Sequence, residues 1–307
     1  MPASGQRISR AEAKQALLRS GYLIESRIEK ILAEEGYYVE ANDAYLDPHT
    51  GKSREIDLYA LTAQDIGRGM DFVFNAILIE CVNNPQPLVL LSKEPQVGFL
   101  FHEDLRVAGL PVKLAPTQPG GSWVSINEAL RLEKFHHYCV SRVATQFCSF
   151  TRKSNQEWFA QHEGPHFDSF QKLCDAVDYA QDQHFKSWRF TDDEPMNIEI
   201  YYPVLVVQGE LLEARPLTRS VRLRHANHLQ FRRTVIRGAS PSTYQLDIVT
   251  EEYFPRFLEM LNDELGTIIR RIKTRMRRFR DSIQKMASKG KRLRSPDAIR
   301  RHLENPS

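Results

Sequence analysis

The chain has 307 residues, of which 41% are hydrophobic and 26% charged, and this ordinary composition allows a substantial core and argues against wholesale disorder. No apolar run is long enough to span a bilayer, the N-terminus lacks the apolar stretch of a signal peptide, and the four cysteines form no Cys-x-x-Cys pair. These features predict a soluble cytoplasmic protein without a structural zinc site, and they disfavour a membrane as its partner.

The charge is unevenly distributed, although the net charge is only +3. Between Arg270 and Arg301 the chain has fourteen basic residues and two acidic ones, so the remainder is acidic. A basic segment attached to an acidic body favours an anionic partner.

The spacing of apolar residues predicts the elements of the first third of the chain. A helix is expected over residues 11–35, where leucine and isoleucine recur at helical spacing before Gly36. Four strands are expected to follow, at 37–40, 53–61, 76–82 and 88–91. The third of these is nearly all apolar, which is typical of a strand buried on both faces.

The remainder of the chain is expected to contain helices, then strands, then a last helix. Residues 127–182 have a helical pattern that is broken at 162–165. Strands are expected at 197–207, with a continuation at 210–214, and at 244–249, after which Thr250 begins a helix that runs into the basic segment. This order predicts an α/β domain with a mixed sheet over residues 1–265, a helical insertion at about 127–195, and a basic C-terminal helix and tail over 266–307.

Three carboxylates lie where the pattern predicts burial. Asp57 is inside an expected strand, Glu80 ends the apolar run of the next strand, and Glu25 borders the apolar face of the first helix. Burial of an ionised carboxylate is costly unless the group is paired or coordinates a metal. The alternative for each residue is a solvated acid. Together, three oxygen ligands on neighbouring elements would suit Mg²⁺ or Mn²⁺ rather than zinc.

The order of these residues resembles that of a known family. A helical Glu25, then Glu55-Ile56-Asp57 on one strand and Ile79-Glu80-Cys81 on the next, is similar to the PD-(D/E)XK, or restriction-endonuclease-like, superfamily. The resemblance covers residues 15–95 and, more weakly, the strand at 198–208. It implies a mixed sheet flanked by helices and a metal-dependent nuclease that cleaves a DNA phosphodiester. Homodimers are common among such nucleases.

The resemblance also assigns roles to individual residues. Asp57 and Glu80 would bind Mg²⁺ or Mn²⁺, the carbonyl of Cys81 would be a further ligand, and Glu25 would hold a metal-bound water. The lysine of the family motif, which orients the attacking water and stabilises charge, should stand two residues after Glu80. This chain has Val82 there, and valine can do neither.

Three explanations of Val82 are open, and one of them is an engineered substitution. A replacement group could come from nearby, and the candidates are Asn83, Asn84, Gln86 and Lys93. Alternatively, the chain is a catalytically silent nuclease fold that binds nucleic acid or a partner protein.

Basic side chains in two regions are candidates for nucleic-acid contact. Ile268, Ile272, Met276 and Phe279 recur at helical spacing, which predicts an amphipathic helix with a basic opposite face that includes Arg271, Arg275 and Arg278. Phosphate contact, a merely solvated face and an anionic membrane are alternatives for this helix.

The second region surrounds His225 and His228, which lie among Arg224, Arg232 and Arg233. Nucleic-acid contact competes there with a solvated basic loop. The adjacent residues His136 and His137 would point about 100° apart on a helix, so they are expected at the surface or the core edge rather than on a metal.

Overall fold

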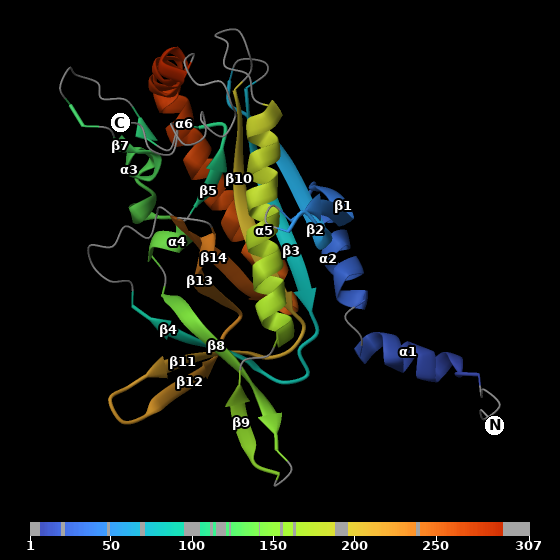
Figure 1. Cartoon of the computed structure of the whole chain (residues 1–307). Coiled ribbons are helices and arrows are strands. Elements are labelled where there is room, and N and C mark those ends of the chain that lie inside the picture. The colour runs from blue at the N-terminus through green and yellow to red at the C-terminus, as the bar shows by residue number, and fades with distance from the viewer. Residues whose placement is uncertain are drawn as a thin grey trace.

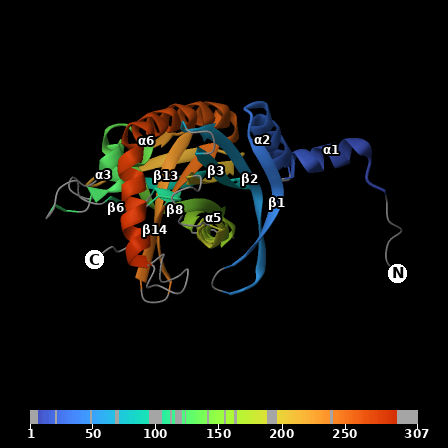
Figure 2. The same ribbon diagram turned by 90° about the horizontal axis from the view of Figure 1, so that it is seen from above.

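The computed structural model describes residues 7–290 apart from 20–21, 48–49, 68–70, 95–104, 111–112, 115–120, 123, 141, 154–155, 162–163, 188–195 and 238–239. Within these residues, twelve strands form one large mixed sheet and two more pair separately. Helices cover both faces of the large sheet (Figure 1, Figure 2). The fold is therefore α/β with a mixed sheet flanked by helices, as the sequence predicts. No helix in this part of the chain has the length and hydropathy that crossing a bilayer requires.

The first half of the chain begins with helices and continues mainly as strands. These elements are α1 (Arg10–Arg19), α2 (Tyr22–Glu34), β1 (Tyr38–Leu46), β2 (Ser53–Asp65), β3 (Phe72–Val82), β4 (Leu88–Lys93), β5 (Arg106–Ala108), β6 (Lys113–Leu114), β7 (Val124–Ser125), α3 (Ile126–Leu130), a 3₁₀ turn (Leu132–Lys134) and α4 (His137–Val140). Gly36 has a φ of 81°, a left-handed conformation that suits glycine, and it follows the end of α2.

The second half alternates hairpins with the two longest helices. Its elements are β8 (Val143–Arg152), β9 (Trp158–Gln161), α5 (Gly164–Ser187), β10 (Asn197–Val207), β11 (Leu211–Pro216), β12 (Val221–His225), β13 (His228–Arg237), β14 (Ser240–Thr250), a 3₁₀ turn (Glu251–Tyr253) and α6 (Phe254–Gly290).

The centre of the sheet is built from four strands. β1, β2 and β3 pair antiparallel in chain order, and β10 then pairs parallel with β3 over its whole length. A parallel neighbour requires a crossover connection, and α5 is the last helix of that connection before β10. Beyond β10 the order is β14, β13, β8, β4, β11 and β12, so the later hairpins extend the sheet.

Two hydrophobic cores lie on opposite faces of the sheet. One contains Ile24 and Ile28 of α2 together with the apolar side of α6, including Leu261 and Ile268. The other packs α5, through residues such as Leu173, against the opposite face. Figure 2 shows α2 and α6 on one side of the strands and α5 on the other. The amphipathic helix expected in the basic segment is confirmed, since its apolar stripe is buried against the sheet.

Several expected elements differ from the structure. Residues 143–152 and 158–161 form strands β8 and β9 instead of helix, because threonine and phenylalanine suit a pleated, half-buried strand better than a helix. The region expected to be a basic loop contains β12 and β13. The last part of the expected C-terminal tail, residues 291–307, lies outside the described residues.

Candidate active site

Strands β2 and β3 separate at Asp57. Their pairing ends at Leu58 and Ile79, although β3 continues to Val82. Ile56 and Leu58 would share a face of a regular strand, yet they belong to cores on opposite faces of the sheet. On β1, Asn42 lies opposite Asp57 and has a φ of 53°, a left-handed conformation that asparagine tolerates. The strand therefore twists at Asp57.

This separation lets side chains take the place of backbone pairing. The amide N–H of Cys81 donates to Asp57 Oδ2 at 2.7 Å. In return, the backbone amide of Asp57 donates to the carboxylate of Glu80. Asp57 and Glu80 are thus brought together at the point where β2 leaves β3.

A lysine from another element completes the group. Lys172 Nζ on α5 lies 3.0 Å from both Oε1 and Oε2 of Glu80. The side chain of Glu80 is only 4% exposed, whereas that of Lys172 is 32% exposed. Val82 shares the strand face of Glu80 and packs against the same core as α5. The amino group that contacts Glu80 therefore comes from Lys172 on α5, whereas Val82 on the strand is apolar.

The ionised forms of the three carboxylates are disfavoured, because the pKa of each is raised. Burial and repulsion by Asp57 raise the pKa of Glu80 to about 8, although Lys172 opposes the shift. Burial also raises the pKa of Asp57, against the Cys81 amide and Lys172. Glu25, in the first turn of α2, has its pKa raised by burial and by Asp57, with Lys172 again opposing. Asp57 therefore acts on both of the other carboxylates.

The chemistry of these residues would suit a divalent cation, although the three carboxylates are not among the groups of described residues whose ligand atoms all lie within 4.8 Å of one another. Each of the three acids is harder to ionise than usual, because one lysine does not offset their burial and mutual repulsion. A cation of charge two would relieve this strain, and carboxylate oxygens are the ligands that Mg²⁺ prefers. Asp57 and Glu80 would hold the ion, with the carbonyl of Cys81 beside them.

The suggested replacements for the motif lysine lie in the turn after β3 and at the end of β4. Asn83 and Gln86 are half-buried in the turn between β3 and β4. Asn84 is occupied in that turn, where its Oδ1 accepts from the Gly209 amide at 2.9 Å. Lys93 is exposed at the end of β4, opposite Val143 of β8. Sequence reasoning missed Lys172, and no local motif could have revealed it.

The basic residues expected to contact nucleic acid fall into two places. Arg271 donates to the carbonyl of Arg131 at 2.8 Å and to that of Leu130, and it stacks on Phe135, while Arg275 donates to the Arg271 carbonyl. These two arginines, with Arg278, lie towards the C-terminal end of α6. Farther along α6, Arg280 pairs with Asp71, just before β3 begins, whereas Glu80 is near the end of that strand.

Among the other basic residues, Arg233 contacts α5 next to Lys172. Arg233 donates to the Phe167 carbonyl at 3.2 Å and to Gln171 Oε1 at 3.0 Å, both in the first part of α5. Arg232 is its neighbour on β13, and Arg224 on β12 pairs with the buried Glu213.

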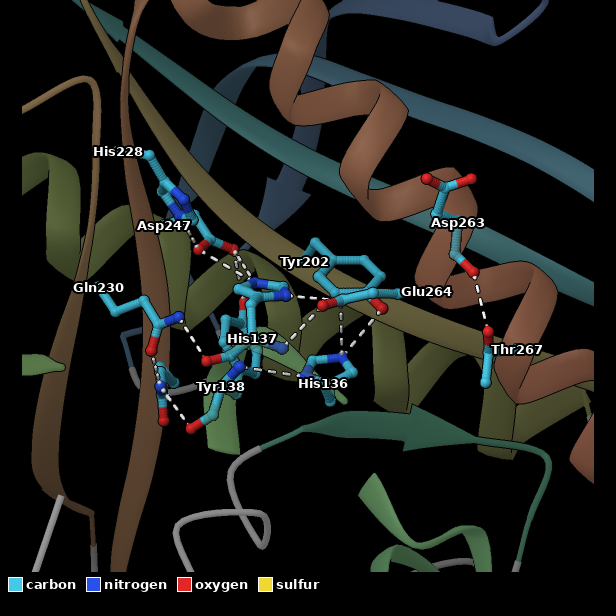
Figure 3. Close-up of polar contacts among 11 residues, drawn as sticks. His136, His137, Tyr138, Tyr202, His228, Gln230, Asp247, Asp263, Glu264 and Thr267 are labelled. Carbon is cyan, nitrogen blue, oxygen red and sulfur yellow. Dashed lines mark hydrogen bonds and ion pairs between the residues drawn. The ribbon is translucent and has the colours of Figure 1, made fainter. Parts of the chain in front are cut away.

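A second polar cluster is buried beneath α6 (Figure 3). His137 Nδ1 lies 2.6 Å from Glu264 Oε2, and its Nε2 lies 3.2 Å from Asp247. Asp247 also accepts from Tyr138 at 2.9 Å and contacts His228 Nε2 at 2.7 Å. The expectation of a surface or core-edge role for His137 and its neighbour His136 was wrong, because both are buried.

The buried cluster is joined by hydrogen bonds. Two sets, His136–His137–Glu264 and His137–His228–Asp247, have ligand atoms within 4.8 Å of one another. Two ligands of a tetrahedral zinc ion stand about 3.3 Å apart, whereas the 2.6 and 2.7 Å separations here are hydrogen-bond lengths. Burial alone would lower the pKa of His137, but Asp247 and Glu264 raise it to about 9. His137 is therefore a charged link between two carboxylates.

Comparison of the chain with family models, with curated proteins and with solved structures gives no match.

Proposed function

We propose that the protein is a metal-dependent nuclease of the restriction-endonuclease-like type that cleaves phosphodiester bonds in DNA. The observation that carries the proposal is the contact of Lys172 with both oxygens of Glu80, beside Asp57. It supplies, from α5, the amine that the strand lacks at Val82. The order of helix α2, antiparallel β2 and β3, helix α5 and parallel β10 also supports this fold type.

The residues of the site have distinct roles in the proposed reaction. A bound Mg²⁺ or Mn²⁺ would supply Lewis-acid neutralisation of the phosphate charge. Asp57 and Glu80 would hold that ion, and Glu25 would orient the water that attacks phosphorus. The ammonium of Lys172 would stabilise the charge that develops as one P–O bond forms and another breaks. A nuclease fold retained only for binding is the alternative, and Lys172 weighs against it.

The proposal is tested with labelled duplex and single-stranded DNA, in Mg²⁺ and then in Mn²⁺, with cleavage and gel shift measured together. We expect the wild type to cleave and Lys172→Met to cleave at least about 100-fold more slowly, because a charge-stabilising donor is lost. DNA binding by this variant should persist. Lys186→Met, an exposed lysine of the same helix, is the matched control and should cleave like the wild type.

Three results would contradict parts of this proposal. A wild type that shifts DNA without cleaving it would make the fold a binding module. Cleavage unchanged in Lys172→Met would remove the role given to this lysine. A wild type that cleaves RNA but not DNA would correct the substrate.

A further inference from the structure

The β11–β12 hairpin has one strongly basic face. Cross-strand partners lie on the same face of a hairpin, and here Glu213 is opposite Arg224 while Arg215 is opposite Arg222. The face therefore carries three arginines and one acid, and Arg219 lies in the turn that joins the strands. Every residue of β12 is exposed.

A buried carboxylate organises the base of this face. Glu213 is fully buried, and Arg215 Nη2 lies 3.0 Å from its Oε2. Arg224 pairs with the same oxygen, and Arg142, at the start of β8, lies 3.1 Å from Oε1. Ser92 of β4 also donates to Glu213. Glu213 thus fixes three guanidinium groups in a defined arrangement.

The positive charge of this face exceeds what Glu213 neutralises. Four guanidinium groups, those of Arg142, Arg215, Arg222 and Arg224, face one buried carboxylate and the exposed Glu94 that pairs with Arg142. Like charges placed directly opposite each other on paired strands are destabilising. Arg215 and Arg222 form such a pair, and Arg215 shares Glu213 with two other arginines, so an anion between Arg215 and Arg222 would lower the remaining repulsion.

The hairpin starts at the end of the sheet where Glu80 lies. Glu80 is in register with Leu205 of β10, and β11 begins six residues after Leu205. A strand rises about 3.3 Å per residue, so Arg215 is at most about 33 Å along the chain from Leu205, the partner of Glu80. This distance is close to one helical turn of duplex DNA. Figure 1 shows β11 and β12 beyond the end of β3, on the side where α5 begins.

We propose that this basic face of the β11–β12 hairpin binds backbone phosphates of the nucleic acid. These phosphates would lie within about one helical turn of the phosphodiester bond that is cleaved at Glu80. This inference rests on the proposed function, because it assigns the substrate's polyanionic backbone to a surface of the same molecule. Contacts to phosphates position a duplex without reading its sequence. The arginines held by Glu213 are preorganised, so they lose little freedom on binding.

The test uses the salt dependence of duplex binding in EDTA, measured by fluorescence anisotropy without cleavage. The variant is Arg219→Gln/Arg222→Gln, which leaves the Glu213 contacts intact. Each phosphate contact contributes a slope of about −0.9 in a plot of log K against log salt, so we expect a slope less steep by about 1.8. The same relation gives about fivefold per contact at about 0.15 M salt, or about 30-fold weaker binding for the double variant.

The control Lys134→Gln/Lys186→Gln removes two positive charges from exposed sites on other elements and should bind like the wild type. Equal affinity and slope in the hairpin variant and the wild type would overturn the inference, and so would a wild type that does not bind DNA. Loss of binding to phosphatidylserine vesicles, with DNA binding unchanged, would replace it with a membrane role. Cleavage is scored separately, so hairpin-dependent binding without cleavage would refute only the nuclease proposal.

Discussion

Replacement of Glu80 by glutamine should stabilise the metal-free protein, and more so as the pH rises. The carboxylate has an ordinary pKa of 4.5 and a pKa of about 8 in the folded chain. An acid whose pKa is raised by folding stabilises the folded state fully only below its unfolded pKa. That stability is lost as the pH rises from about 4.5 through about 8.

The size of the effect follows from the shift. Each pKa unit corresponds to about 1.36 kcal/mol, so the penalty of Glu80 grows from about 1 kcal/mol at about pH 5 to about 5 kcal/mol at about pH 9. Glutamine has no such penalty. The attraction between Lys172 and the ionised carboxylate is already contained in the pKa of Glu80, so its loss in the variant adds no separate cost. The difference in free energy of unfolding should therefore widen by about 4 kcal/mol in favour of the variant.

Urea denaturation in EDTA at several pH values measures this difference directly. All other titrating groups are common to both proteins, so their contributions largely cancel. A difference that does not change with pH would refute the reasoning, since it would mean that folding leaves the pKa of Glu80 at its ordinary value. A variant that becomes relatively less stable at high pH would refute it more strongly.

Three further predictions concern the metal, the buried histidine and a glycine. Asp57→Asn should lose the rise in melting temperature that Mg²⁺ gives the wild type, as thermal unfolding with and without the ion would show. His137→Gln should cost about 3–5 kcal/mol near pH 6, because it leaves Asp247 and Glu264 without their shared partner. The cost should shrink by about 3 kcal/mol between pH 6.5 and 9, because the histidine of the unfolded chain loses its proton in this range and folding must then take one up. In the same urea experiment, His225→Gln, an exposed control, should change stability by less than about 0.5 kcal/mol. Gly109→Ala should be more destabilising than Gly36→Ala by at least about 2 kcal/mol. Both glycines have positive φ, but only at Gly109 would a Cβ collide with the Asn197 carbonyl. Equal losses of stability in the two variants would count against that contact.

The sequence singles out the parts of the candidate site that depend on local pattern. A carboxylate inside a strand or at the end of an apolar run is conspicuous, and for this reason Asp57 and Glu80 stand out in the sequence. Their strands, β2 and β3, were also expected close to their observed bounds. Local periodicity and the cost of burying charge were sufficient for this half of the site.

The sequence could not predict what tertiary packing decides. Lys172 stands on an amphipathic helix among other polar residues, and only the docking of α5 against β3 turns it toward Glu80. Similarly, His136 and His137 are polar residues, so their burial is not evident from the sequence. It is stabilised by contacts of His137 with Asp247 and Glu264, which lie on distant elements. Of the hairpin strands, β11 and β14 were expected, whereas β8, β9, β12 and β13 were missed, because short or half-exposed strands contain too few apolar residues for a clear period.

The distance along the chain between Glu80 and Lys172 has a consequence for synthesis. The two residues are 92 positions apart, and translation adds about 5–20 residues per second. For roughly 5–18 seconds the nascent chain therefore contains Glu80 but not yet Lys172. If it is a nuclease, its cutting centre cannot assemble until α5 has left the ribosome and docked, so an unfinished chain would spare the nucleic acid around it.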